Sequence, residues 1–261
     1  IGGKRVTKPV PPTIDQWTHY LHNASNNAVA DDTEVGPPRH MQWLGSPRWT
    51  RTHHKLNTIS SVVTSAGRLF FIVDSSSAAS WDVPSRWEIV ARDAFSGVQL
   101  WRRGIESWHE TRQTGFRSGP PELTRLLVAS GTRVFVPLAR GAAVHALDAA
   151  TGKVVTAYKA TVGADEIILQ DDILLALCKA PAAGPNGPVV DRRGKPLPGK
   201  SVVAVDTMSG KKLWSWARGQ LVPMPETLAA DDTRVFFQVN NAVVCLDLLT
   251  GKELWTYEIG R

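Results

Sequence analysis

The sequence predicts an all-β protein, and three observations carry this prediction. A short phrase occurs four times, with an apolar run, an Asp, two variable residues, Ser or Thr, a Gly and a second apolar run. Each copy follows two further apolar runs that are separated by residues typical of tight turns. The runs are short and rich in Val, Ile, Leu and Trp, which favours strands over helices. A chain built from repeated four-stranded units is therefore expected.

The recurring phrase predicts a β-hairpin. Its Asp side chain can accept hydrogen bonds from backbone N–H groups two or three residues further on, and its Gly can adopt the left-handed conformation that precedes the return strand. A Trp usually follows four places after the Gly. The residues concerned are Asp93, Gly97 and Trp101; Asp148 and Gly152; Asp206, Gly210 and Trp214; and Asp247, Gly251 and Trp255. In the second copy Thr156 replaces the Trp, and Tyr158 follows two residues later.

The hairpin before each phrase completes a four-stranded antiparallel unit, which is the blade of a β-propeller. Its turns are Ala66-Gly67, Gly131-Thr132, Asp171-Asp172 and Asp231-Asp232-Thr233. The glycines of the phrase are 55, 58 and 41 residues apart, a period typical of propellers and repeat arrays. We expect the four blades at about residues 58–104, 123–160, 164–218 and 225–259.

The phrase Asp-x-x-[Ser/Thr]-Gly-x-x-Leu-Trp, with an Arg-x-Phe hairpin before it, resembles the repeat of the PQQ-like β-propellers. That family holds quinoprotein alcohol dehydrogenases and the lipoprotein scaffold of outer-membrane barrel assembly. The resemblance covers about residues 58–259. It implies a ring of seven or eight blades, of which this chain holds four, and a place in the periplasm or cell envelope of a bacterium. It also implies that Trp101, Trp214 and Trp255 are buried between adjacent blades.

Residues 1–57 are expected to form an extended N-terminal arm that ends in a lone strand. Residues 1–13 are basic and rich in Pro and Gly, as in a linker. The chain opens at Ile1 without a leader sequence, so we expect any signal peptide to be absent from it. Met41-Gln42-Trp43 is strand-like, and Trp43 is expected to act as the docking Trp of a blade that this sequence lacks. An open arrangement of blades is therefore preferred, with a closed four-bladed ring as the alternative.

Two long segments interrupt the repeat, at residues 102–122 and 179–200. The second is rich in Pro and Gly and lies between the second and third strands of its blade. We expect it to be an exposed excursion, either a mobile loop or a binding loop on a rigid scaffold.

Composition sets broad limits. With 261 residues and 43% hydrophobic content the chain can bury a large core. No apolar stretch approaches the roughly 20 residues of a membrane span. The formal net charge of +6 permits acidic partners. Cys178 and Cys245 follow apolar strand residues in different blades, which favours buried free thiols, with a disulfide as the alternative.

Known catalytic and metal-binding motifs are mostly missing. The resemblance implies a quinone held against a disulfide of adjacent cysteines, with calcium and an Asp base. This sequence has no adjacent cysteines, so neither PQQ nor calcium is expected as a cofactor. His19 and His22 could share a helical face and bind a metal, but no third and fourth ligands stand at a recognisable spacing. The Asp pairs are explained by turn formation.

A basic and aromatic stretch before the first blade is the remaining candidate for ligand or partner contacts. Its residues are Arg48, Trp49, Arg51, His53 and His54. Such residues can contact phosphates and stack on bases. A solvated loop before the first blade is the preferred explanation, and nucleic acid is not expected to bind.

The function expected from this pattern is that of a non-catalytic scaffold or protein-interaction module, taken from a larger bacterial envelope protein. Its partner would be another protein or the remaining blades, and pairing with a second copy is an alternative. Two other functions stay open: part of a quinoprotein-type oxidoreductase whose cofactor ligands lie outside this chain, and a propeller that binds carbohydrate or another small ligand.

Overall fold

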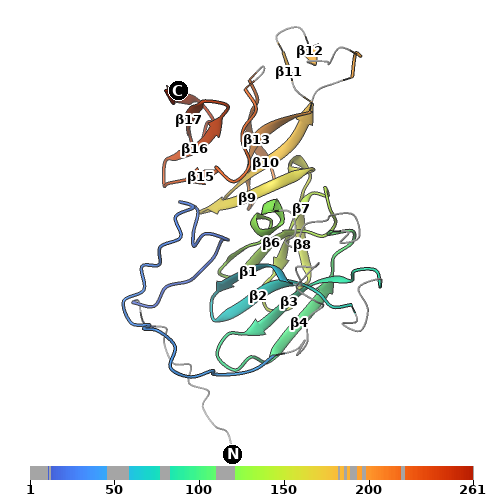
Figure 1. The fold of residues 1–261 in the computed structure, drawn as a ribbon, viewed down its shortest axis with the longest axis vertical. Helices are drawn as coiled ribbons and strands as arrows, with labels where there is room; N and C mark the ends of the chain where they lie inside the picture. Colours follow the sequence, from blue (N-terminus) through green and yellow to red (C-terminus); the bar gives the residue numbers. More distant parts are fainter. Residues whose placement is uncertain are drawn as a thin grey trace, which may run out of the picture.

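The computed structural model describes residues 11, 13–45, 59–76, 83–109, 121–181, 183–184, 187–188, 193–195, 198–218 and 221–260. Figure 1 shows that strands make up the regular structure from β1 onward, whereas the N-terminal arm is drawn without strands. The helices in the described ranges are the short 3-10 helices η2 (Pro121–Arg125) and η3 (Lys159–Thr161). None of the helical segments in these ranges has the length and hydrophobicity needed to cross a bilayer. The prediction of an all-β fold is confirmed.

The strands form four antiparallel sheets of four strands each, with their order in the sheet following the order in the chain. The first sheet contains β1 (Ile59–Ser65), β2 (Arg68–Asp74), β3 (Trp87–Asp93) and β4 (Gln99–Gly104). The second contains β5 (Val128–Ser130), β6 (Arg133–Pro137), β7 (Val144–Asp148) and β8 (Val154–Tyr158). The third contains β9 (Ala164–Gln170), β10 (Ile173–Pro181), β13 (Pro198–Asp206) and β14 (Lys212–Trp216). The fourth contains β15 (Ala229–Ala230), β16 (Arg234–Val239), β17 (Ala242–Asp247) and β18 (Glu253–Glu258).

Tight turns join the first two strands of each sheet. Ala66 and Gly67, at φ 49° and 72°, connect β1 to β2, and this pair of left-handed residues matches the right-handed twist of a hairpin. Asp171, at φ 51°, takes the same role between β9 and β10. The turn residues read from the sequence therefore lie where the hairpins need them.

The four sheets are arranged side by side as an open arc. The first strand of each sheet contacts the first strand of the next, in the order β1, β5, β9 and β15. These strands line the inner side of the arc, and the last strand of each sheet lies on the outer side (Figure 1). One apolar core extends through the first three sheets and a second joins the third and fourth. Strands β3 and β9 are buried on both faces, as expected for sheets covered by neighbours. The molecule is a partial β-propeller, since the arc does not close.

The interrupting segments are more ordered at their ends than the sequence suggests. Strands β10 and β13 stay paired as far as Pro181 and Pro198, so residues 179–181 and 198–200 extend a hairpin and are not a loop. Between them β11 (Ala183–Gly184) and β12 (Gly187–Pro188) form a small ribbon. In the other segment Trp108 is completely buried. The expectation that residues 179–200 form a loop excursion was therefore wrong at residues 179–181 and 198–200.

Candidate functional site: the joints between sheets and the open face

The contact between the first and second sheets shows how neighbouring blades are joined. The Trp101 indole Nε1 donates a hydrogen bond of 3.0 Å to the backbone oxygen of Ala149, the residue after Asp148. A Cβ on Gly152 would lie within 3.0 Å of the indole ring, so only glycine leaves room for it. The docking tryptophan of one sheet is therefore seated on the Asp-to-Gly turn of the next, which we call its acceptor turn.

The third and fourth sheets repeat this joint. The Trp214 Nε1 donates to the backbone oxygen of Leu248 at 2.8 Å, and a Cβ on Gly251 would again collide with the indole. Trp101 is 9% exposed and Trp214 is 8% exposed, as the sequence predicts for docking residues.

Tyr158 replaces the tryptophan where the second sheet meets the third. Its hydroxyl donates to the backbone oxygen of Thr207 at 3.1 Å, and Thr207 stands at the position of Ala149 and Leu248. The side chain is fully buried and stacks on Phe135 with ring centroids 6.1 Å apart. Apart from its chain neighbours, no atom of the described residues lies within 4 Å of the place where a Cβ on Gly210 would be. This joint therefore keeps the hydrogen bond but not the ring-on-glycine contact.

Trp43 of the arm makes the same joint with the first sheet. Its Nε1 donates to the backbone oxygen of Ala94 at 3.0 Å, and a Cβ on Gly97 would overlap the indole. Gln42 adds a hydrogen bond of 2.7 Å to the oxygen of Phe95. The docking role expected for Trp43 is therefore seen, although residues 41–45 belong to no strand.

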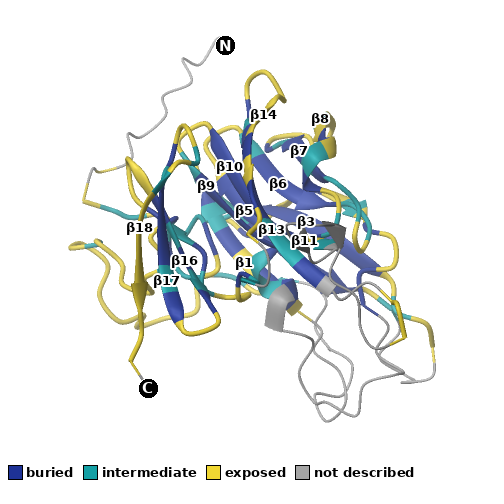
Figure 2. Ribbon diagram, turned by 90° about the horizontal axis from the view of Figure 1, so that it is seen from above, coloured by how far each residue is buried: buried dark blue, intermediate teal, exposed yellow. Residues whose placement is uncertain are grey.

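Trp255 is the exception among the docking tryptophans, and the expectation that it is buried was wrong. Its side chain is 44% exposed, because no further sheet covers β18 in the described part of the chain. It lies on the side of the fourth sheet that carries Phe236, with ring centroids 6.1 Å apart, and Tyr257 follows on that side. Figure 2 shows β18 as a largely exposed strand. We call the side with Phe236, Trp255 and Tyr257 the open face.

A comparison of the fourth sheet with the first shows which surface of the repeat the open face corresponds to. In the first sheet Phe70 and Trp101 have ring centroids 6.0 Å apart, on the side that packs against the second sheet. In the first sheet Phe70 pairs with Ala91, and Ala91 pairs with Trp101 on the next strand. The fourth sheet has the same register, because Phe236 pairs with Cys245 and Cys245 pairs with Trp255. The open face is thus the surface that every earlier sheet uses to bind its neighbour.

The acceptor turns are held by their carboxylates. Asp93 Oδ1 accepts hydrogen bonds from the backbone N–H of Ser96 at 2.7 Å and from its hydroxyl at 2.8 Å. These bonds hold the pKa of Asp93 below its ordinary value. The carboxyls of Asp148, Asp206 and Asp247 accept equivalent bonds from the Ser or Thr three residues later, and their pKa values are lowered too. The four Asp and Gly positions therefore act as turn formers.

The arm also ties the inner edges of all four sheets together. Residues 17–24 run across the first strands and supply one hydrogen-bond acceptor to each. In the first and second sheets, the backbone N–H of Thr64 donates to the Trp17 oxygen and that of Ala129 donates to the Thr18 oxygen. In the third sheet the N–H of Leu169 donates to His19 Nε2, and in the fourth the N–H of Ala230 donates to the Ala24 oxygen. An exposed strand edge is thereby covered in every sheet.

A buried ion pair lies at this inner side. Glu166 of β9, whose side chain is 1% exposed, accepts from Arg125 at 3.0 Å and from the backbone N–H of Glu226 at 2.8 Å. Arg125 also donates to Asn26 of the arm and lies over the Tyr20 ring. Burial raises the pKa of Glu166 to about 7, although Arg125 opposes this shift. This pair was not predicted from the sequence, where the available signal was a charged residue, Glu166, within an apolar run.

The histidines predicted as metal candidates have other partners. His19 is buried, its Nε2 accepts from Leu169 and its Nδ1 lies 2.7 Å from the Thr18 hydroxyl. Burial lowers the pKa of His19 to about 3, so the ring is neutral. His22 pairs with Asp15, and Asp31 lies near them. The two histidines meet across a turn and not on a helix, and Asp15 is satisfied by His22 and the Asp31 N–H.

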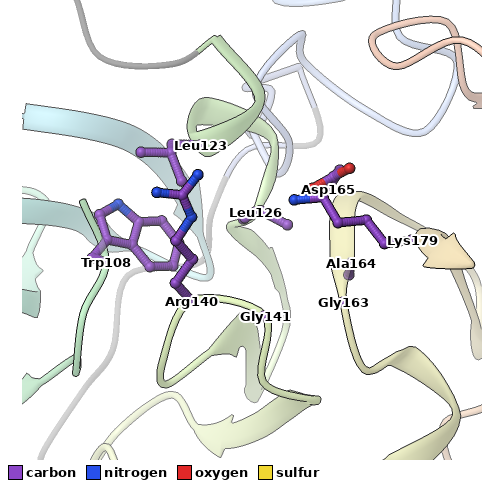
Figure 3. Close-up of a pocket in the computed structure, with 9 residues that line it drawn as sticks. All are labelled: Trp108, Leu123, Leu126, Arg140, Gly141, Gly163, Ala164, Asp165 and Lys179. Carbon is purple, nitrogen blue, oxygen red and sulfur yellow. Dashed lines mark ion pairs between the residues drawn. The ribbon is translucent and has the colours of Figure 1, made fainter. Parts of the chain in front are cut away.

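A small pocket lies between the second and third sheets, on the side of the connecting loops (Figure 3). Its volume is about 50 Å³, and Arg140, Lys179 and Asp165 are its charged residues. Asp165 pairs with Lys179 at 3.1 Å and with Lys200 at 2.9 Å. Drug-sized ligands occupy pockets of about 300–1,000 Å³, so this one has room for waters or a small anion but not for a sugar ring.

Two remaining predictions concern cysteines and the basic stretch. Cys178 and Cys245 are buried and free, which confirms the interpretation as free thiols. Burial raises the pKa of the Cys178 thiol to about 12. Arg48, Trp49, Arg51, His53 and His54 lie outside the described residues, so ligand or partner contacts there stay predictions.

The fold and the joints define a class: a partial β-propeller of PQQ-like repeats. The family model described as outer membrane protein assembly factor BamB matches residues 85–261, which is more than half of the chain. The chain belongs to this family. No curated protein sequence matches it.

A solved structure agrees on the fold. Quinohemoprotein alcohol dehydrogenase from Comamonas testosteroni is similar with a TM-score of 0.54 and 12% identity, over 93% of this chain and 41% of that one. BamB from Moraxella catarrhalis gives a TM-score of 0.39 and 16% identity, over 77% of this chain and 58% of that one. The chain thus spans less than two thirds of either structure. At 12% identity the likeness to the Comamonas testosteroni structure shows the fold alone.

Proposed function

We propose that this chain is a non-catalytic propeller scaffold of the bacterial cell envelope, and that it works by binding protein through the open face of its fourth sheet. The observation that carries the proposal is the exposure of Trp255. Its equivalents Trp101 and Trp214 are buried in joints, whereas Trp255 presents the same side chain in the same strand register to solvent. Exposed aromatic faces of this kind mark interaction surfaces.

The partner chemistry follows from the three joints within the chain that involve an indole. A matching surface offers a backbone carbonyl for the Trp255 Nε1 and a glycine that leaves room for the ring. A further blade with an Asp-x-x-[Ser/Thr]-Gly turn has both features. Either the rest of a longer propeller or a separate protein of the same repeat type can supply it.

Quinone-dependent oxidation is not part of this proposal. The resemblance implies a quinone held against a disulfide of adjacent cysteines, and the two cysteines here lie in different sheets, buried and free. A titration with PQQ and calcium, followed by absorbance, tests the alternative. We expect no saturable spectral change, and a saturable one with dehydrogenase activity would overturn the non-catalytic proposal.

The open face can be tested by adding a blade. A copy of residues 221–261 is fused to the end of the chain, so that the acceptor turn of the copy is available to Trp255. We expect the Trp255 fluorescence to move to shorter wavelength, and the ring to become protected from oxidation by N-bromosuccinimide. The control fusion carries Gly251→Val in the copy, where the added side chain blocks the indole. Equal exposure of Trp255 in the two fusions would contradict the proposal.

A further inference from the structure

The two ends of the arc are complementary surfaces. At one end of the arc the fourth sheet carries a docking tryptophan, Trp255, that is not seated on a turn. At the other end the first sheet carries an acceptor turn, Asp93 to Gly97, which lies between β3 and β4. The joints made by Trp101 and Trp214 each consist of these two parts, brought together from consecutive sheets. The open face of one molecule therefore fits the acceptor turn of the first sheet of another.

The acceptor turn of the first sheet is occupied by a residue of the same chain, Trp43. Trp43 takes the acceptor turn of the first sheet, with its Nε1 on the Ala94 oxygen and its ring over Gly97. Unlike every other docking aromatic residue, it comes from a segment outside the sheets, and its neighbours Met41 and Leu44 are 74% and 78% exposed. Trp43 and Gln42 attach this part of the arm to the turn through hydrogen bonds to the oxygens of Ala94 and Phe95, and Gly45 lies beside the Arg92 side chain of β3.

We propose that a second copy of this chain is a partner for the open face, and that Trp43 is an intramolecular cap that blocks this pairing. When Trp43 leaves the acceptor turn, Trp255 of the second copy takes its place. This inference rests on the proposed function, because it uses the same open face.

Symmetry makes the pairing a closed one. Each copy contributes four blades, and the contact from Trp255 to the Gly97 turn is head-to-tail. Two such contacts related by a twofold axis close a ring of two chains, whereas a contact that did not close would build filaments. Two copies supply eight blades, within the four to eight blades that propellers typically contain.

The cap works through effective concentration. A residue on the same chain competes at an effective concentration on the order of millimolar. A second copy at micromolar concentration loses this competition, so the parent chain is monomeric. Removing the Trp43 side chain frees the turn without touching the open face, and we expect dimerisation to become about 100-fold tighter.

The test uses sedimentation velocity on the full chain over a range of concentrations. We expect Trp43→Ala to form a dimer at concentrations where the parent is monomeric, and Trp43→Phe, which keeps a ring but loses the Nε1 donor, to give a smaller shift. Met41→Ala is the matched control, because Met41 is exposed in the same segment; it should behave like the parent. Circular dichroism checks that each variant is folded.

Two double variants identify the contact. Trp43→Ala with Trp255→Ala removes the docking residue, and Trp43→Ala with Gly97→Val blocks the turn; both should be monomeric. A folded Trp43→Ala variant that stays monomeric at the highest concentration would overturn the inference, and so would a dimer that survives Trp255→Ala. If the fused blade protects Trp255 while Trp43→Ala remains monomeric, the proposed function stands and self-pairing alone is wrong.

Discussion

The first and fourth sheets contain the same phrase and differ in what covers it. Trp101 follows its Gly by four residues, pairs through Ala91 with Phe70 and is seated on the second sheet. Trp255 has the same spacing and pairs through Cys245 with Phe236 at the equivalent positions, but its side chain is 44% exposed. The repeat therefore fixes where a docking side chain points, whereas the neighbouring sheet decides whether it is buried. Whether a docking tryptophan is buried therefore depends on both its own sheet and the sheet beside it.

Tryptophan removal should show the largest difference between the two ends. Trp101→Ala is expected to lower the free energy of unfolding by about 3–5 kcal/mol, the range for large aromatic residues in a core. Trp255→Ala should lower it by about 1 kcal/mol or less, as for a surface substitution. Urea unfolding followed by circular dichroism gives both values. Equal losses would mean that Trp255 is covered in solution.

Glycine substitution gives the next largest difference, this time between acceptor turns. Gly152→Ala places a Cβ within 3.0 Å of Trp101 and strains a backbone at φ 70°, so a loss of about 2–4 kcal/mol is expected. Gly210→Ala has the same left-handed strain, at φ 71°, but beyond its chain neighbours the new Cβ has no described atom within 4 Å. There the loss should be about 1–2 kcal/mol. Similar midpoints in urea for the two variants would show that Trp101 is not held against Gly152.

The sequence was sufficient for the local parts of this fold. The Asp, Ser or Thr, and Gly of each phrase act within five residues, so their hairpins could be predicted from turn chemistry alone. The path of the arm could not be, because residues 17–24 bond to strands between 47 and 206 residues away, such as Thr64 and Ala230. The Glu166–Arg125 pair was missed for the same reason. Trp255 was misjudged because repeat identity says nothing about the last neighbour.

The carboxylates of the two regions should respond to pH in opposite directions. Glu166 at the inner side has a folded pKa of about 7, above the ordinary value of 4.5. Its folded state holds a proton that the unfolded chain has released, so between these values stability should fall as pH rises. Glu166→Gln should remove this slope in urea midpoints measured from pH 5 to pH 7.5. A slope unchanged by the substitution would assign it to another group.

The smallest expected effect is at the outer turns, where the sign is reversed. Hydrogen bonds from the Ser or Thr lower the pKa of all four turn carboxyls below the ordinary 3.8. Their contribution to stability is therefore present above pH 4 and is lost as pH falls through the lowered pKa values. Asp206→Asn keeps the size of the side chain and removes its charge, so the variant should lose less stability than the parent between pH 4 and pH 2. Asp231→Asn is the matched control, because Asp231 accepts the same kind of bonds in the turn between β15 and β16, which is not one of the acceptor turns. The two variants should show the same acid response, since the effect arises within each turn; a larger change for Asp206 would mean that its ionisation is coupled to the Tyr158 joint next to it.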